Sequence, residues 1–356
     1  DPILYDVLLA HGAQIDETNH DGANALHLLA SKIDNLSELD YFINKGLDIK
    51  SEDSLGNNMF NYAATKGNIK IMDQLISKGL DFKGLNKEGG NAMIYASYGA
   101  RRYTNPIKVY QYLDGLGIKA NIVTDKGITP FHNIAYSTKD TTILDFFLEK
   151  GVDIDQQDED GNTAFLNAVN GENFEVIKYL LPKVSDINLQ NKDGHSALTY
   201  AISNKLVDFF DLLISKGADA TIIDKNGNNL AYYVYKSYDA EKSPHFLKSL
   251  EGKDVDVAQA QANGHTVFHL ALDGASIPLL KKALELKVDI NQKNEDGLTP
   301  LHLAAMKANE DTVLKWLLAN GADKTILTDF DESAFDLASE NEILSKNGIE
   351  LQFLKK

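Results

Sequence analysis

The chain has 356 residues and a formal net charge of −17, with 43% hydrophobic residues and no cysteine. This composition predicts a folded, soluble chain, and it excludes disulfide frameworks, thiolate metal sites and cysteine nucleophiles. The acidic balance argues against nucleic acid or an anionic membrane as a partner, and no apolar run is long enough to span a bilayer. The compartment stays open between the cytoplasm and a periplasmic or secreted location.

Turn glycines that follow acidic or amide residues recur along the chain at intervals of 33 to 38 residues. A period near 33 indicates an array of structural repeats. Each unit begins with a polar residue that can cap a helix, as Thr129 before Pro130 and Thr299 before Pro300 do. A short helix containing alanines follows, and then a second helix with a larger apolar stripe. The turn glycines are Gly22, Gly56, Gly89, Gly127, Gly161, Gly194, Gly227, Gly264 and Gly297, and Asp331 takes the next such place.

The two ends of the chain depart from the full unit. The first residues match only the second helix of a repeat, and Ile3, Leu4 and Val7 would lack part of their cover, so we expect a further half repeat upstream. The last residues, which end in Lys355 and Lys356, are typical of a polar C-terminal cap. We therefore divide the chain into a partial repeat at 1–18, full repeats at 19–52, 53–85, 86–123, 124–157, 158–190, 191–223, 224–260, 261–293 and 294–327, and a cap at 328–356.

Short sequence motifs also recur at the same place in successive repeats. Residues 296–305 read DGLTPLHLAA and residues 125–135 read DKGITPFHNIA, and related words stand in nearly every unit. In these words the chain resembles the ankyrin repeat family. The resemblance implies an all-α solenoid of stacked helix-turn-helix repeats, joined by extended hairpin turns and wound into a curved superhelix. The richness in asparagine and lysine without cysteine favours a bacterial source.

No residue pattern in the chain predicts catalysis or a cofactor. The recurring histidines stand one per repeat, too far apart to share one metal ion, and the resemblance implies that they tie turns together by hydrogen bonds. The acidic run before Gly161 fails as a calcium loop, because Gln156 and Asn167 stand where carboxylates are needed. We therefore expect no enzyme activity, no cofactor and no metal site. The histidines concerned are His27, His132, His269 and His302.

The resemblance also implies which positions line a concave binding groove: the hairpin tips and the residues that follow the first-helix alanines. Most of these positions are polar, but two groups are apolar. The first group, with its charged rim, comprises Leu85, Tyr98, Arg101, Arg102, Tyr103, Val123, Ile128, Tyr136, Glu159 and Asp160. The second group comprises Leu298, Met306, Leu327 and Phe330. Exposed apolar patches and aromatic anchors mark interaction surfaces, so we predict that the first group binds a partner and keep the second as an alternative.

Three functions remain open at the level of sequence. The first is a monomeric scaffold that binds another protein, with a basic patch favoured on the partner by the charge of this chain. The second is a sensor of a peptide or small molecule, built from aromatic loops in the two longest units. The third is an acidic decoy for a basic protein. The loops concerned hold Tyr95, Tyr98, Arg101, Arg102 and Tyr103, and Tyr232, Tyr233, Tyr235 and Tyr238.

Overall fold

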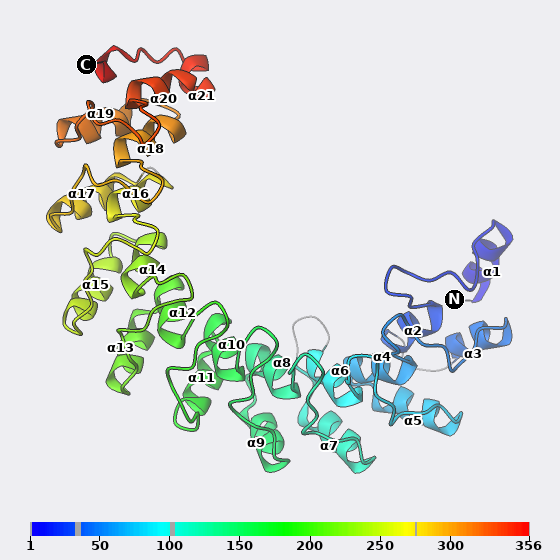
Figure 1. Ribbon diagram of the computed structural model, residues 1–356. Coiled ribbons are helices and arrows are strands. Elements are labelled where there is room, and N and C mark those ends of the chain that lie inside the picture. The colour runs from blue at the N-terminus through cyan, green and yellow to red at the C-terminus, as the bar shows by residue number, and fades with distance from the viewer. Residues whose placement is uncertain (1, 33–36, 100–103, 275, 356) are drawn as a thin grey trace. The chain divides into compact units, whose positions relative to one another are not determined.

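A computed structural model describes residues 2–32, 37–99, 104–274 and 276–355. In these ranges the regular structure is helical, with one isolated antiparallel bridge between Leu327 and Ser333. The chain divides into two compact units, residues 1–192 and residues 193–356. Each unit is a stack of helix pairs, as Figure 1 shows. This confirms the predicted all-α repeat solenoid.

The first unit contains a leading helix and five helix pairs. Its first helices pack against one another, α2 on α4, α4 on α6, α6 on α8 and α8 on α10. The bounds are α1 (Pro2–Ala10), α2 (Ala25–Ala30), α3 (Ser37–Asn44), α4 (Met59–Lys66), α5 (Ile69–Ser77), α6 (Ala92–Tyr98), α7 (Ile107–Gly115), α8 (Pro130–Ser137), α9 (Thr141–Glu149), α10 (Ala164–Asn170) and α11 (Phe174–Leu180).

The second unit contains five more pairs and a final turn of 3₁₀ helix, Gln352–Leu354. Its first helices again pack in sequence, from α12 through α14, α16 and α18 to α20. The bounds are α12 (Ala197–Ser203), α13 (Val207–Ser215), α14 (Leu230–Lys236), α15 (Ser243–Glu251), α16 (Val267–Leu272), α17 (Ile277–Glu285), α18 (Pro300–Lys307), α19 (Thr312–Ala319), α20 (Ala334–Glu340) and α21 (Glu342–Lys346).

The first helices start where the sequence predicts, because each has a capping residue with an extended backbone. In four of the repeats the cap is closed by a histidine three residues later. At Thr129, for example, the backbone N–H donates to Nδ1 of His132 over 3.1 Å, and His132 Nε2 lies 3.1 Å from the carbonyl oxygen of Asn162 in the next repeat. The ring therefore joins its own cap to the neighbouring repeat. His27, His269 and His302 make the same two kinds of hydrogen bond, as the resemblance implied; the carbonyl bound by His269 lies in the next repeat, and those bound by His27 and His302 lie at the end of their own repeat.

The hairpin turns form a second set of links between repeats. The N–H of Lys192 donates to the carbonyl of Asp160 over 2.8 Å, and similar bonds join most successive tips within each unit. Gly161 makes this approach possible, since its φ is +80° and an added Cβ would lie 2.8 Å from the Lys192 nitrogen. Asp331, which the sequence placed at a glycine position, has a φ of 61°. The left-handed turn is thus kept there without glycine.

Two repeats are longer than the others. Their extra residues lie in the loops that join the two helices of the repeat, between α6 and α7 and between α14 and α15. The far end of the first loop is fixed by Asn105. Its Nδ2 donates to the carbonyls of Ala64, Thr65 and Ala96 at 3.1, 3.2 and 2.9 Å. These carbonyls lie at the ends of α4 and α6, so one buried amide closes two helices in neighbouring repeats. The insertion therefore does not disturb the stacking around it.

Candidate functional site

Two tyrosines of the first unit occupy the same place in neighbouring repeats. Tyr98 in α6 and Tyr136 in α8 each stand seven residues after the N-cap of their helix, which is Asn91 or Thr129; we call this place the seventh position. Their side chains are 52% and 58% exposed. Since α6 packs on α8, the two repeats present aromatic surface next to each other. The structure thus places both tyrosines on the surface, as the sequence predicted.

Each ring is held by its neighbours although it is exposed. Tyr136 lies so close to Gly171 that a Cβ added there would meet its ring at 2.9 Å. Tyr98 packs edge-on against Tyr95, with ring centroids 5.9 Å apart. Burial of part of its surface raises the pKa of the Tyr98 phenol, and the carboxylate of Glu88 raises it further. Both tyrosines are therefore positioned aromatic groups, the kind that anchors protein interfaces.

The hairpin tips beside these tyrosines add apolar surface. Leu85 is 60% exposed and Val123 is 46% exposed, while Ile128 is half-buried. Lys126 forms an ion pair of 2.8 Å with Glu88 across neighbouring tips. The pKa of Lys126 is raised mainly by Glu88 and also by Glu159 and Tyr98, so these groups lie near the Lys126 ammonium.

Two predicted rim residues, Glu159 and Asp160, are exposed at the tip that follows. Glu159 donates its N–H to the carbonyl of Lys126 over 2.7 Å, and Asp160 accepts from Lys192. The remaining rim residues, Arg101, Arg102 and Tyr103, lie outside the described residues. The structure thus brings Tyr98, Lys126 and Glu159 into one neighbourhood and gives the site an acidic edge.

The second predicted group lies in the second unit and is less uniform. Met306 is 49% exposed and Phe330 is 81% exposed, whereas Leu298 and Leu327 are half-buried. The carbonyl of Leu298 accepts from the His269 ring, and Leu327 makes the isolated bridge to Ser333. Two of the four residues therefore serve the contact between repeats through their backbones.

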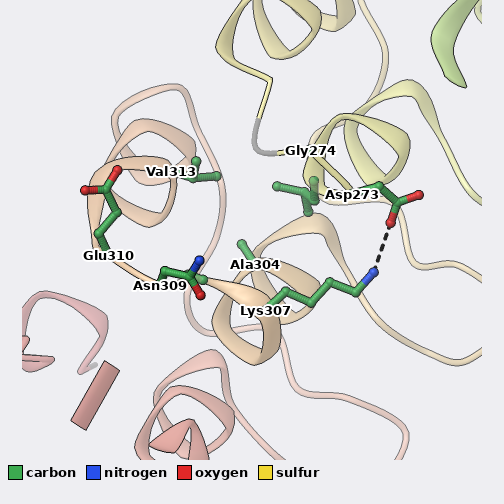
Figure 2. A pocket seen from close by; sticks show the side chains of 9 residues that line it. Asp273, Gly274, Ala304, Lys307, Asn309, Glu310 and Val313 are labelled. Atoms are coloured by element: carbon green, nitrogen blue, oxygen red, sulfur yellow. Dashed lines mark hydrogen bonds and ion pairs between the residues drawn. The ribbon is translucent and has the colours of Figure 1, made fainter. Parts of the chain in front are cut away.

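In this unit Met306 is at the seventh position of its own repeat, but in the two repeats before it the seventh position is ion-paired. It holds Lys236 and Asp273, whose charged atoms lie 3.1 Å apart, and Lys307 approaches Asp273 to 3.0 Å from the next repeat. Burial would raise the pKa of Asp273, but the bonds from Lys307 and Lys236 hold it below its ordinary value. Figure 2 shows Asp273 and Lys307 at the wall of a pocket of about 560 Å³, with Glu310 on its far side. The charges of Lys236, Asp273 and Lys307 therefore compensate one another.

Five tyrosines of the ligand-sensor hypothesis lie on helices and not in loops, whereas Tyr238 follows α14 and Arg101, Arg102 and Tyr103 lie outside the described residues. Tyr95 and Tyr98 lie on α6, and the first three tyrosines of the other group lie on α14. Tyr233 is 8% exposed and donates its hydroxyl to Asp224 over 2.8 Å, and Tyr235 is 2% exposed and donates to the carbonyl of Val257. Tyr233 and Tyr235 therefore belong to the core and to its hydrogen bonds. Their positions correct the sequence-based interpretation.

Asn105 and three lysines are features that the sequence analysis missed. Lys66, Lys70 and Lys108 line one pocket, although 42 residues separate the first from the last. No short motif links them, so only the stacking of repeats brings them together. Among the described residues no group of three or more metal-ligating side chains lies close enough to hold an ion, and no helix is long and apolar enough to cross a membrane.

Comparison with known proteins gives consistent matches. A family model described as "Ankyrin repeats (3 copies)" matches residues 3–86, 93–191, 131–224 and 230–328. Ankyrin repeat domain-containing protein 40 of Homo sapiens is 43% identical over 72 residues, 20% of this chain and 19% of that protein.

Two further relatives match different shares of their own length. Dauer abnormal formation protein 25 of Caenorhabditis elegans is 30% identical over 107 residues, 30% of this chain and 27% of that protein. Protein phosphatase 1 regulatory subunit 27 of Homo sapiens is 27% identical over 99 residues, 28% and 62% of the two chains. The matches thus span less than two thirds of each of these relatives.

Proposed function

Since the chain belongs to the ankyrin repeat family, we propose that it is a monomeric scaffold that binds another protein through Tyr98 and Tyr136 and has no catalytic role. One observation carries this proposal: two neighbouring repeats of the first unit have exposed tyrosines at the seventh position, whereas Lys236 and Asp273, at that position in two neighbouring repeats of the second unit, form an ion pair. Exposed aromatic side chains held in place by their neighbours lose little conformational entropy on binding. The first unit therefore offers the better anchor.

The surroundings of the tyrosines indicate the shape and charge of the partner. Leu85, Val123 and Ile128 extend the apolar surface along the tips, and Glu159 and Asp160 add negative charge beside it. A partner with an apolar side chain between the tyrosines and a basic residue at the rim would fit this surface. The relative named as a regulatory subunit of protein phosphatase 1 supports a role in binding another protein.

The structure gives less support to the other functions. A pocket of about 550 Å³ beside Thr104, Asn105 and Ser137 favours the ligand sensor, but the buried tyrosines of α14 do not. The decoy requires acidic residues gathered on one face. Instead, lysines alternate with them along the tips, as in the pairs Lys126 with Glu88 and Lys293 with Asp329. We therefore keep the ligand sensor as the second candidate only.

The experiment starts by placing a photo-crosslinking residue at Leu85 or, in a second sample, at Phe330, and identifying what is crosslinked in the native host. Affinities of the purified partner are then measured for Tyr98→Ala and Tyr136→Ala. Each substitution removes an aromatic anchor worth roughly 2 kcal/mol, so each should weaken binding about thirtyfold.

The matched control is Phe330→Ala, which removes an exposed aromatic side chain from the second unit and should leave the affinity unchanged. Thermal unfolding of all three variants should resemble that of the wild type, because the side chains are exposed. If both tyrosine variants bind normally while Leu298→Ala or Phe330→Ala does not, the partner docks on the second group and the proposal is wrong.

A further inference from the structure

Three lysines from two successive repeats surround one pocket at the edge of the first unit. Lys66 ends α4, Lys70 lies in the first turn of α5, and Lys108 lies in the first turn of α7. All three side chains are exposed, and the pocket between them has a volume of about 360 Å³. Its other lining residues are Gly67, Asn68 and Ile69, so no acidic residue lines it.

The relative position of these lysines is fixed by the backbone beneath them. Gly67 has a φ of +68°, and an added Cβ would lie only 2.2 Å from Oδ1 of Asn105. Asn105 in turn donates to carbonyls at the ends of both α4 and α6, which locks the start of α7 onto the loop between α4 and α5. Lys108 is therefore held beside Lys66 and Lys70 by a buried contact, and the pocket exists before any ligand binds.

The charge of this pocket is unusual for the chain, whose net charge is −17. Within the described ranges, no carboxylate forms an ion pair with any of the three lysines, whereas many other lysines do form such pairs. Lys70 and Lys108 stand in first turns that contain no acidic residue, where a positive charge opposes the helix dipole. Helix stability therefore does not explain why lysine occupies both positions.

The equivalent edge of the second unit shows the contrast. There the pocket of Figure 2 also contains a lysine, Lys307, but Asp273 neutralises it at 3.0 Å and Glu310 adds a further carboxylate. The same place in the repeat is thus internally compensated in one unit and uncompensated in the other. An uncompensated cluster is a surface on which a ligand of opposite charge gains most.

We propose that Lys66, Lys70 and Lys108 form a docking pocket for an acidic, aspartate- or glutamate-rich segment of a protein. The inference rests on the proposed function in that it assigns a second contact to the same partner. Thr65, which precedes Lys66, stands at the seventh position of its own repeat, so the pocket borders the surface of Tyr98. In addition to the apolar side chain at the tyrosines and the basic residue at the rim, the partner then presents a run of carboxylates to the lysines.

The test uses the full chain and a fluorescent hexaglutamate peptide, with binding followed by anisotropy at low and high salt. The wild type should bind the peptide, and added salt should weaken the binding because it screens exposed charges. Lys66→Glu, Lys70→Glu and Lys108→Glu together should weaken it about tenfold or more. The control is Lys119→Glu, Lys178→Glu and Lys192→Glu, three exposed lysines of the same unit with the same change in net charge.

Each outcome separates the pocket from its alternatives. Equal loss in both triple variants would show a general charge effect and overturn the proposal, as would a wild type that does not bind. Inorganic phosphate is measured in parallel: binding of phosphate without binding of the peptide would assign the pocket to a small anion instead. Tyr98→Ala should bind hexaglutamate like the wild type. Partner affinity therefore tests the tyrosines, and hexaglutamate binding tests the lysine pocket, so one proposal can fail without the other.

Discussion

In the unit of residues 1–192, two neighbouring repeats have Tyr98 and Tyr136 at the seventh position, whereas in the unit of residues 193–356 two neighbouring repeats have Lys236 and Asp273 there. The helices beneath are built alike in both units, with the same caps and the same packing of first helices. In one unit the side chains remain available to a partner, and in the other they pair with each other. On the proposed function, the residues at one repeated position, and not the scaffold beneath them, determine where a partner binds.

The largest expected effect comes from giving the first unit the residues that the second unit has at this position. Tyr98→Lys with Tyr136→Asp gives the first unit the residues of Lys236 and Asp273. The new pair should form, so the melting temperature should stay near that of the wild type. Loss of both anchors should weaken partner binding by at least about a hundredfold. Calorimetric titration with the partner measures the loss, and an unchanged affinity would break the comparison.

A smaller effect is expected from a fall in pH, because each unit contains two buried histidines that close helix caps. Burial lowers the pKa of His27, His132, His269 and His302, and that of His269 to about 4, although each carbonyl contact raises it. The unfolded chain takes up these protons near pH 6.5, and the folded chain does so only at lower pH. Stability is therefore complete above pH 6.5 and falls as the pH drops toward 4.

For His269 alone, the free energy of unfolding should fall by about 2 kcal/mol between pH 7.5 and pH 5. His269→Thr, which imitates the cap that Thr199 makes at Ser196, should remove this part of the pH dependence. Denaturant titrations at the two pH values measure it, with exposed His11→Gln as the control. The interpretation fails if His269→Thr keeps the full pH dependence of the wild type.

The smallest effect is expected from loss of the ion pairs that Asp273 forms in the second unit. Asp273→Asn removes the ion pairs to Lys236 and Lys307, but these groups are exposed, so the loss of stability should be at most about 1 kcal/mol. Partner affinity should not change. Thermal unfolding and the binding assay are compared with Glu295→Gln, an exposed carboxylate nearby. A drop in affinity as large as that of the tyrosine variants would move the binding surface to the second unit.

The sequence predicts most of the fold because its signals are local. A cap such as Thr129, its histidine three residues later and the turn glycine can each be recognised within a few residues. Tyr98 and Tyr136 could be placed on the surface for the same reason, since a fixed period fixes the face on which a residue lies. Whether they bind a partner stays a prediction, because exposure alone does not establish contact.

What the sequence does not predict depends on contacts between distant residues. Asn105 bonds to Ala64, 41 residues earlier, and the amide looks like any other loop residue until the repeats are stacked. The sequence predicts a loop around Tyr233 and Tyr235 because this repeat is one of the two longest. In the structure Asn229 caps α14 with its side chain, which carries both tyrosines into the core. The extra residues of this repeat therefore lie after α14, in the loop before α15.

The hydrogen bonds made by Asn105 have a consequence for the evolution of such a chain. Gly99 on one side is bonded to α6, and Asn105 on the other side is bonded to the ends of α4 and α6. Residues gained or lost between these two anchors leave the phase of every later repeat intact. We therefore expect this interval to accept new binding sequence, by evolution or by grafting a foreign epitope, without a change in the stacking of the other repeats.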